Sequence, residues 1–199
     1  MEYVSRSLNP DEEVIRIGHF HWLYTFSAIM WVVIGVIGLC AVLYAGYYWE
    51  VSRALASQFQ GLPASLKGQA WSEIVAQKGG FFSVIKGLHI GVKCLAIASL
   101  VFGLFFFAQM MVVRAYTEIC ITTERLILKQ GVLSVNSDEL NVDRIEGVNV
   151  TQGIIGRWLN YGNVIVRGMG IGEVRLPPMV DPVGFRRAID QAKAVDNKN

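Results

Sequence analysis

The chain has 199 residues, of which 53% are hydrophobic and 17% are charged, and its mean hydropathy is +0.40. The formal net charge is only +2, and this nearly neutral mixture argues against a nucleic-acid-binding surface, which needs clustered basic residues. The three cysteines, Cys40, Cys94 and Cys120, have no metal-ligand spacing, so we interpret them as reduced core residues.

Residues 1–21 form a short polar segment of mixed charge, and the apolar run that follows is too long for a cleaved signal peptide. No Lys, Arg, Asp or Glu lies between Arg16 and Glu50, and residues 22–43 supply the roughly 20 apolar positions that cross a bilayer as a helix. Aromatic residues flank this run at both ends, as in the interfacial belts of membrane proteins. The sequence therefore predicts a membrane-spanning helix that begins at Trp22.

Residues 50–87 form a linker between this run and a second apolar run. Leu66, Ala70 and Ile74 recur at helical spacing, and Gly79-Gly80 ends the pattern. One interpretation is a short amphipathic helix on the membrane surface. The other is a loop packed on the chain's own helices or on those of a neighbouring subunit.

Residues 94–113 form the second predicted span. Lys93 and Arg114 stand at its two ends, where long cationic side chains reach lipid headgroups, so we expect lipid contacts there. An alternative role for Lys93 in a transport path lacks an acidic partner in either span. Ser99 and Gly103 are small residues four positions apart, a spacing that favours close helix packing.

Two spans place both termini on the same side of the membrane. Basic residues on the two sides nearly balance, so charge alone does not set the orientation. Arg6, Arg16, Arg114, Arg125 and Lys129 flank the outer ends of the pair, against Arg53, Lys78, Lys86 and Lys93 around the linker.

After Arg114 the pattern changes to short alternating runs separated by turn residues, which predicts an antiparallel sheet. Gly168, Gly170 and Gly172 precede a strand-like segment, so we interpret them as a hairpin turn and not as a phosphate-binding loop. A final helix is predicted from a capping residue, a proline at the first position and one apolar stripe. These are Asp181, Pro182, and the set Phe185, Ala188, Ile189 and Ala192.

Four segments in order carry a family resemblance. They are His21-Trp22, residues 121–133, residues 139–168 with Asp143, Ile145, Gln152, Gly156, Tyr161 and Gly162, and residues 181–189. Together they resemble bacterial membrane proteins that carry a pleckstrin-homology-like (PH-like) domain of the second bacterial type. The resemblance covers about residues 116–189, and the linker is long for the simple hairpin of that family.

The resemblance implies a two-helix transmembrane hairpin followed by a mainly-β PH-like domain, in which a C-terminal helix caps two nearly orthogonal antiparallel sheets. We accordingly expect an N-terminal cytoplasmic segment at 1–21, the hairpin at 22–113 and the PH-like domain at 114–199. The domain would face the cytoplasm, which makes the chain a multi-pass protein of the bacterial inner membrane with both termini cytoplasmic.

The sequence predicts no catalytic, metal or cofactor site. The C-terminal domain lacks histidine, and His19, His21 and His89 lie near the predicted membrane boundaries. His19 and His21 as metal ligands would lack an acidic or cysteine partner. The loop at 122–125 has one Arg and one Glu, which disfavours phosphoinositide recognition by several basic residues. Weaker contact with anionic lipid is an alternative for a set of cations: Arg125, Lys129, Arg144, Arg157, Lys93 and Arg114.

Arg157, Trp158 and Leu159, together with Arg144, are the predicted interaction surface, because Trp and Arg are enriched at binding hot spots. The alternative is that Trp158 and Ile155 close one end of the β-barrel.

We therefore expect a non-enzymatic, membrane-anchored adaptor or scaffold whose partners are membrane lipids and an unidentified membrane protein or a second copy. One alternative is an accessory subunit of a membrane transport or energy-converting complex that makes contact through the helices and linker. A weaker alternative is binding to an anionic lipid surface.

Overall fold

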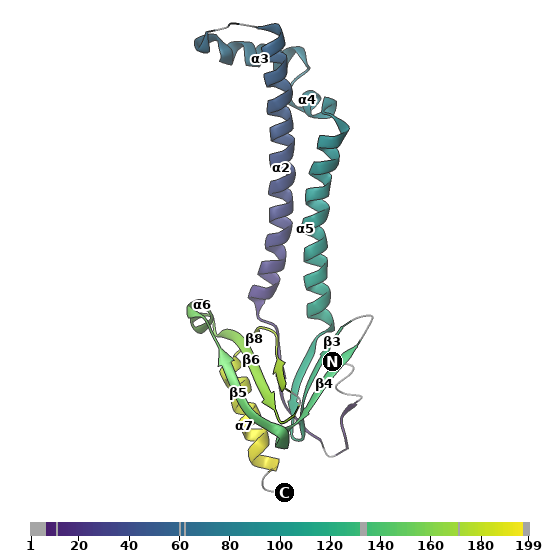
Figure 1. The fold of residues 1–199 in the computed structure, drawn as a ribbon, viewed down its shortest axis with the longest axis vertical. Coiled ribbons are helices and arrows are strands. Elements are labelled where there is room, and N and C mark those ends of the chain that lie inside the picture. The colour runs from purple at the N-terminus through teal and green to yellow at the C-terminus, as the bar shows by residue number, and fades with distance from the viewer. Residues whose placement is uncertain are drawn as a thin grey trace. The chain divides into compact units, whose positions relative to one another are not determined.

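The computed structural model describes residues 7–10, 12–59, 61, 63–131, 135–170 and 172–196 (Figure 1). Of the residues used above, Arg6 and residues 132–133 lie outside this part. The chain divides into two compact units. Met1–Ser27 and Gln109–Asn199 form the first, here called the β unit, and Ala28–Ala108 form the second, the helical unit.

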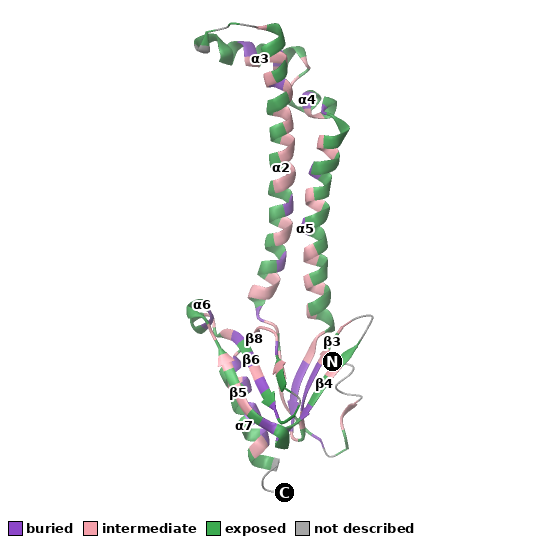
Figure 2. Cartoon of the chain, viewed as in Figure 1, coloured by how far each residue is buried: buried purple, intermediate pink, exposed green. Residues whose placement is uncertain are grey.

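Two long helices, α2 (Trp22–Gln58) and α5 (Ile90–Tyr116), run through the helical unit and reach into the β unit. Both are long and apolar enough to cross a membrane by length and composition. Large apolar side chains are exposed along both helices, where Figure 2 shows exposed (green) positions alternating with half-buried (pink) ones. A helix that is apolar on all sides needs a non-aqueous environment, so the two predicted spans are supported. The first helix begins at Trp22 as predicted but continues through residues 50–58 of the predicted linker.

The two helices approach each other closely at small residues. A Cβ atom added at Gly103 would lie 2.5 Å from the carbonyl oxygen of Trp31 and 3.0 Å from the Cα of Gly35. One turn away, the Ser99 hydroxyl donates a hydrogen bond to the Gly35 carbonyl oxygen at 3.3 Å. The structure thus places Ser99 and Gly103, the pair selected for helix packing, on the face of α5 that contacts α2.

The rest of the linker folds into short helices: η1 (Ala64–Leu66), α3 (Lys67–Gln77) and α4 (Phe81–Gly87). Ala70 and Ile74 are buried on α3, and Ile74 packs with Val51 of α2 and Val84 of α4. Lys78 pairs with Glu50 at 2.8 Å. The linker is therefore helical, as expected for an amphipathic helix. Its apolar face packs on the chain's own helices, as the alternative interpretation of a packed linker expected.

The β unit contains two antiparallel sheets and a C-terminal helix, α7 (Pro182–Asp196), which confirms the predicted PH-like fold class. The first sheet has the order β1-β2-β3-β4: Val14–Gly18, Glu118–Thr122, Arg125–Gln130 and Asn136–Asn141. The second has the order β5-β6-β7 with β8 paired to β6: Ile145–Thr151, Tyr161–Gly168, Gly172–Arg175 and Met179–Val180. The 3-10 turn η2 (Val142–Arg144) links the sheets, and α6 (Ile154–Trp158) links β5 to β6.

The first strand comes from the segment that was expected to precede the domain. β1 pairs antiparallel with β2, so that Ile17 lies opposite Cys120 and Gly18 lies opposite Ile119. Ile15 packs against the main core, and Ile17 packs with Cys120 on the other face of the sheet. Residues 14–18 are therefore an integral edge strand of the β unit.

Helix α7 closes the core between the sheets (Figures 1 and 2). Its predicted stripe is buried against both sheets: Phe185, Ala188, Ile189 and Ala192. Asp181 caps the helix, since its Oδ1 accepts the N–H of Gly184 at 3.1 Å. The predicted hairpin is also present: Gly170, with φ +77°, follows β6, and Gly172, with φ +87°, is the first residue of β7. The predicted C-terminal helix and the predicted glycine turn are therefore confirmed. Both predictions depended only on residues that are close in sequence.

Candidate functional site

Helix α6 stands on a tightly packed base. The Gln152 side-chain amide donates hydrogen bonds to the carbonyl oxygens of Tyr161 at 3.1 Å and Gly156 at 3.5 Å. A Cβ atom at Gly156 would lie 2.7 Å from the Tyr161 carbonyl oxygen, and one at Gly162 would lie 2.6 Å from the Cγ of Gln152. Four residues that carried the family resemblance thus meet at the base of α6 and fix its position.

The turn after α6 is fixed by its own backbone geometry. Asn160 has φ +52°, a left-handed conformation that asparagine tolerates better than most residues. Its carbonyl oxygen accepts the N–H of Asp181 at 3.0 Å, which joins the turn to the start of α7. The chain therefore leaves α6 on a defined path into β6.

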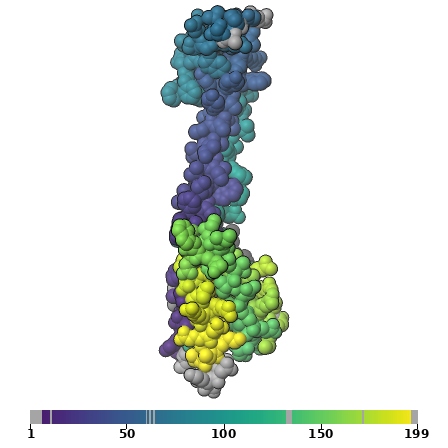
Figure 3. Space-filling view, turned by 90° about the vertical axis from the view of Figure 1, so that its left-hand side faces the viewer, coloured from purple at the N-terminus to yellow at the C-terminus, as the bar shows by residue number. Residues whose placement is uncertain are grey.

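The outer side of α6 is strongly apolar and exposed. Ile154 is 92% exposed, Trp158 is 87% exposed and Ile155 is 64% exposed; we call these three residues the α6 apolar face. Arg157 is exposed beside them, and Leu159 is half-buried. Figure 3 views the β unit from the side on which both α6 and α7 lie at the surface. Trp158 and Ile155 therefore do not close the barrel, and Ile154 is a member of this face that the sequence analysis missed.

His21 packs at the point where the chain enters α2. It is 5% exposed, its ring stacks on Tyr161 with centroids 5.2 Å apart, and its Nδ1 accepts the N–H of Leu23 at 3.2 Å. Nearby, the N–H of Val180 donates to the carbonyl oxygen of His19 at 3.0 Å. His21 is thus a packing residue that joins the start of α2 to Tyr161, the first residue of β6, which is the strand that follows α6.

The other helix also joins the β unit without a linker. Only Thr117 separates α5 from β2, and its hydroxyl donates to the Val113 carbonyl oxygen at 2.7 Å. Arg114, a predicted lipid contact, donates a hydrogen bond to the Thr25 hydroxyl of α2. The ends of both long helices are therefore attached to each other and to the sheets. Among the predicted lipid contacts, Lys93 lies in the helical unit, where its Nζ donates to the Lys86 carbonyl oxygen at 2.5 Å.

Arg125, another predicted lipid contact, binds carboxylates of the protein itself. Its guanidinium binds Glu12 through Nε at 3.0 Å and Nη2 at 2.8 Å, and Glu139 through Nη1 at 2.9 Å. The Arg125 side chain is only 19% exposed and that of Glu12 is fully buried. Lys129 lies opposite Glu118 in the β2–β3 ladder. Arg125 therefore holds the N-terminal segment to the sheet.

The carboxylate of Glu12 also accepts the Thr122 hydroxyl at 2.6 Å and the N–H of Asn9 at 3.1 Å. Burial alone raises the pKa of Glu12, but the hydrogen bonds from Arg125, Thr122 and Asn9 outweigh it and lower the pKa below its ordinary value. The carboxylate is thus ionised and fully bonded in the folded protein.

Arg144 lies far from α6. Its carbonyl oxygen accepts the N–H of Met169 at 2.9 Å, at the end of β5 where Ile145 pairs with Gly168. Thr151, at the other end of β5, leads into α6. The four predicted interaction residues therefore form two separate sites at opposite ends of one strand.

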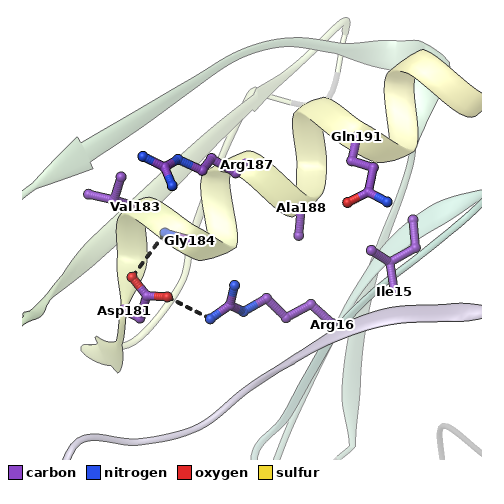
Figure 4. Close-up of a pocket in the computed structure, with 8 residues that line it drawn as sticks. All are labelled: Ile15, Arg16, Asp181, Val183, Gly184, Arg187, Ala188 and Gln191. Atoms are coloured by element: carbon purple, nitrogen blue, oxygen red, sulfur yellow. Dashed lines mark hydrogen bonds and ion pairs between the residues drawn. The ribbon is translucent and has the colours of Figure 1, made fainter.

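A groove of about 340 Å³ lies between β1 and α7 (Figure 4). Arg16 crosses it and pairs with Asp181 at 2.6 Å. Burial raises the pKa of Asp181, but hydrogen bonds from the Gly184 N–H and Arg16 lower it below its ordinary value. This ion pair attaches β1 to the start of α7, and Arg187 and Gln191 also line the groove.

Metal-ligating side chains are not clustered in the described part of the chain. No group of three or more His, Cys, Asp or Glu side chains is placed there to hold a metal ion. Cys120 is fully buried, and burial, assisted by nearby Glu12 and Glu118, raises the pKa of its thiol to about 11. Such a thiol stays protonated at neutral pH and is a poor nucleophile.

The family model of the bacterial PH domain matches residues 74–193, which is more than half of the chain. The match runs from α3 through α5 and the strands β2 to β8 into α7, and it leaves out β1. No curated protein and no solved structure matches the chain. The two antiparallel sheets, the capping helix and this match agree, and the chain belongs to the bacterial PH-domain family.

Proposed function

We propose that this protein is a membrane-anchored, non-enzymatic adaptor. Helices α2 and α5 hold the PH-like domain at the cytoplasmic face of the bacterial inner membrane, where it binds another membrane protein or a second copy of itself. The observation that carries this proposal is the direct attachment of both helices to the sheets: His21 is buried on Tyr161 before α2, and Thr117 alone separates α5 from β2.

Direct attachment has two consequences for binding. It confines the domain to the plane of the membrane, which raises its effective concentration for partners in the same membrane. It also keeps one end of the domain near the bilayer, so the opposite end is the one presented to the cytoplasm. Exposed Arg144 and Met169, which is 54% exposed, lie at that opposite end of β5 and β6. We assign them to the partner-binding surface.

Site-specific photo-crosslinking in intact membranes tests this assignment. A photoreactive amino acid at Arg144 or Met169 should give protein adducts of discrete size, whereas the same residue at Asp190, on the exposed side of α7, should not. The adaptor function is refuted if no exposed position at either end of the domain gives a protein adduct.

The orientation has its own test. A cysteine introduced at exposed Glu73 on α3 should react with an impermeant maleimide in spheroplasts, and one at Met169 should react only after lysis. The opposite pattern would place the domain outside the cytoplasm.

A groove in the helical unit favours a second candidate, an accessory subunit that binds its complex through the helices. The groove has a volume of about 600 Å³ and mostly apolar walls, with Glu50, Arg53 and His89 among its lining residues. Trp49, 71% exposed, also lines it. Under this candidate function, a photoreactive residue at Trp49 gives protein adducts while positions in the β unit give none.

A further inference from the structure

We propose that the α6 apolar face, formed by Ile154, Ile155 and Trp158, inserts into the interfacial layer of the same bilayer that α2 and α5 cross. The inference rests on the membrane anchoring in the proposed function but needs no protein partner. It gives the domain a third contact with the membrane, made mainly by apolar side chains, whereas the sequence predicted lipid contact through cations, Arg157 among them.

The position of α6 within the β unit supports a lipid occupant. The β unit includes the first turn of α2 and the last turns of α5, so the edge of the apolar spans belongs to it. Tyr161 stacks on His21, the residue immediately before Trp22 and the first span. Trp158 precedes Tyr161 by three residues, which reach about 11 Å at full extension. The α6 apolar face therefore lies close to the level at which the chain enters the membrane.

The residue types also fit the interface. Tryptophan concentrates at the level of lipid headgroups because its ring is apolar and its N–H is polar. The two isoleucines, 92% and 64% exposed, supply apolar surface that gains from leaving water. Exposed Arg157 stands between Gly156 and Trp158, where its guanidinium reaches phosphate groups. This combination is typical of segments that lie in the interface plane.

The base of α6 prevents its apolar side chains from folding back onto the domain. The Gln152 side-chain amide donates hydrogen bonds to the carbonyl oxygens of Gly156 and Tyr161. At Gly156 the helix lies so close to the Tyr161 carbonyl oxygen that no side chain fits between them. The apolar face is thus covered only by something outside the β unit. The membrane is the occupant we assign, because it is already present at this end of the domain.

Depth measurements on the full chain in phospholipid nanodiscs test the proposal. Spin labels are attached to Ile154→Cys and Trp158→Cys, with Asp190→Cys as the matched control on the exposed side of α7. Cys40 and Cys94 are replaced by alanine, and buried Cys120 is kept. Labels at positions 154 and 158 should collide several times more often with oxygen than with a water-soluble nickel complex, and the control label should show the reverse. Unchanged thermal unfolding midpoints verify that the variants fold.

A photoreactive residue at Ile154 separates lipid from protein. Adducts with phospholipid support the inference, whereas a protein adduct at this position overturns it and still supports an adaptor. Nickel accessibility at position 154 equal to that of the control also overturns it. Lipid contact at Ile154 without protein adducts anywhere on the domain supports the inference and removes the adaptor function.

Discussion

The Glu12–Arg125 pair offers a sharp test of how the N-terminal strand is held. Glu12→Gln keeps the shape of the side chain but removes the charge that binds Arg125 at 2.8 and 3.0 Å. Breaking a buried ion pair costs about 3–5 kcal/mol. Because Arg125 retains Glu139 and is partly exposed, we expect a smaller loss of about 2–3 kcal/mol here.

The loss should appear as local opening of β1. Its amides exchange with solvent through undocking of the N-terminal segment, so their hydrogen-exchange rates should rise about 30- to 150-fold in Glu12→Gln. The control is Glu13→Gln, since Glu13 is the exposed neighbour and its backbone N–H, not its carboxylate, contacts Thr123. Equal exchange rates in the two variants would refute the role of the ion pair.

The same pair predicts a pH dependence. The pKa of Glu12 is lowered in the folded state, so the carboxylate contributes its full stabilisation above the ordinary value of 4.5. That stabilisation is lost as the pH falls through the lower, folded pKa. Protection of β1 should therefore be constant from pH 7 to about 5 and decline in acid, and in Glu12→Gln this decline should be much weaker.

Three further predictions concern packing. Gly103→Leu should force α5 away from α2, because a Cβ at this position already meets backbone at 2.5 Å. The cost of about 1–3 kcal/mol should appear as a lower unfolding midpoint in nanodiscs. Gly68→Leu is the control and should leave the midpoint unchanged, because a Cβ there meets nothing within 4 Å. Gly156→Val should loosen the base of α6, so that a spin label at position 154 becomes more mobile; an unchanged spectrum would contradict the packing described. Cys120 should resist maleimide at pH 7.5 until the protein unfolds, since its thiol is buried and its pKa is about 11.

The elements that the sequence predicted correctly are those whose signals are local. Helix α7 has its cap at Asp181, its proline at the first position and its apolar stripe within a single segment, so no distant residue is needed to define it. The start of α2 at Trp22 is local in the same way. The end of α2 has no such local signal, because residues 50–58 contain no glycine or proline. The length of an apolar run predicts how much of a helix could cross a membrane, and not where the helix ends.

The site was less predictable because it depends on packing. A helix of five residues is too short for periodicity to show which side faces outward, so the sequence left two interpretations of Trp158 open, a plug of the barrel and an exposed anchor. The contact of Gly156 with Tyr161 decides the matter, and only the folded structure shows it. Arg125 and Arg144 are similar cases: one is bound by Glu12, and the other lies at the far end of β5 from α6.

Strand β1 changes where the domain begins. The segment VIRIG has strand-like composition, but its partner β2 lies about 100 residues later, beyond the reach of local patterns. β1 covers the edge of β2, and Ile15 and Ile17 pack on its two sides.

A fragment that starts at residue 114 should therefore leave an open strand edge and exposed apolar surface, and it should aggregate. The same fragment with residues 7–20 joined through a flexible linker should be soluble, with slow amide exchange in β2. A monomeric fragment with slow exchange in β2 despite lacking β1 would show that the domain is complete without it. Because β1 continues through His21 into α2, the strand that completes the sheet also attaches the domain to the first of the two long apolar helices.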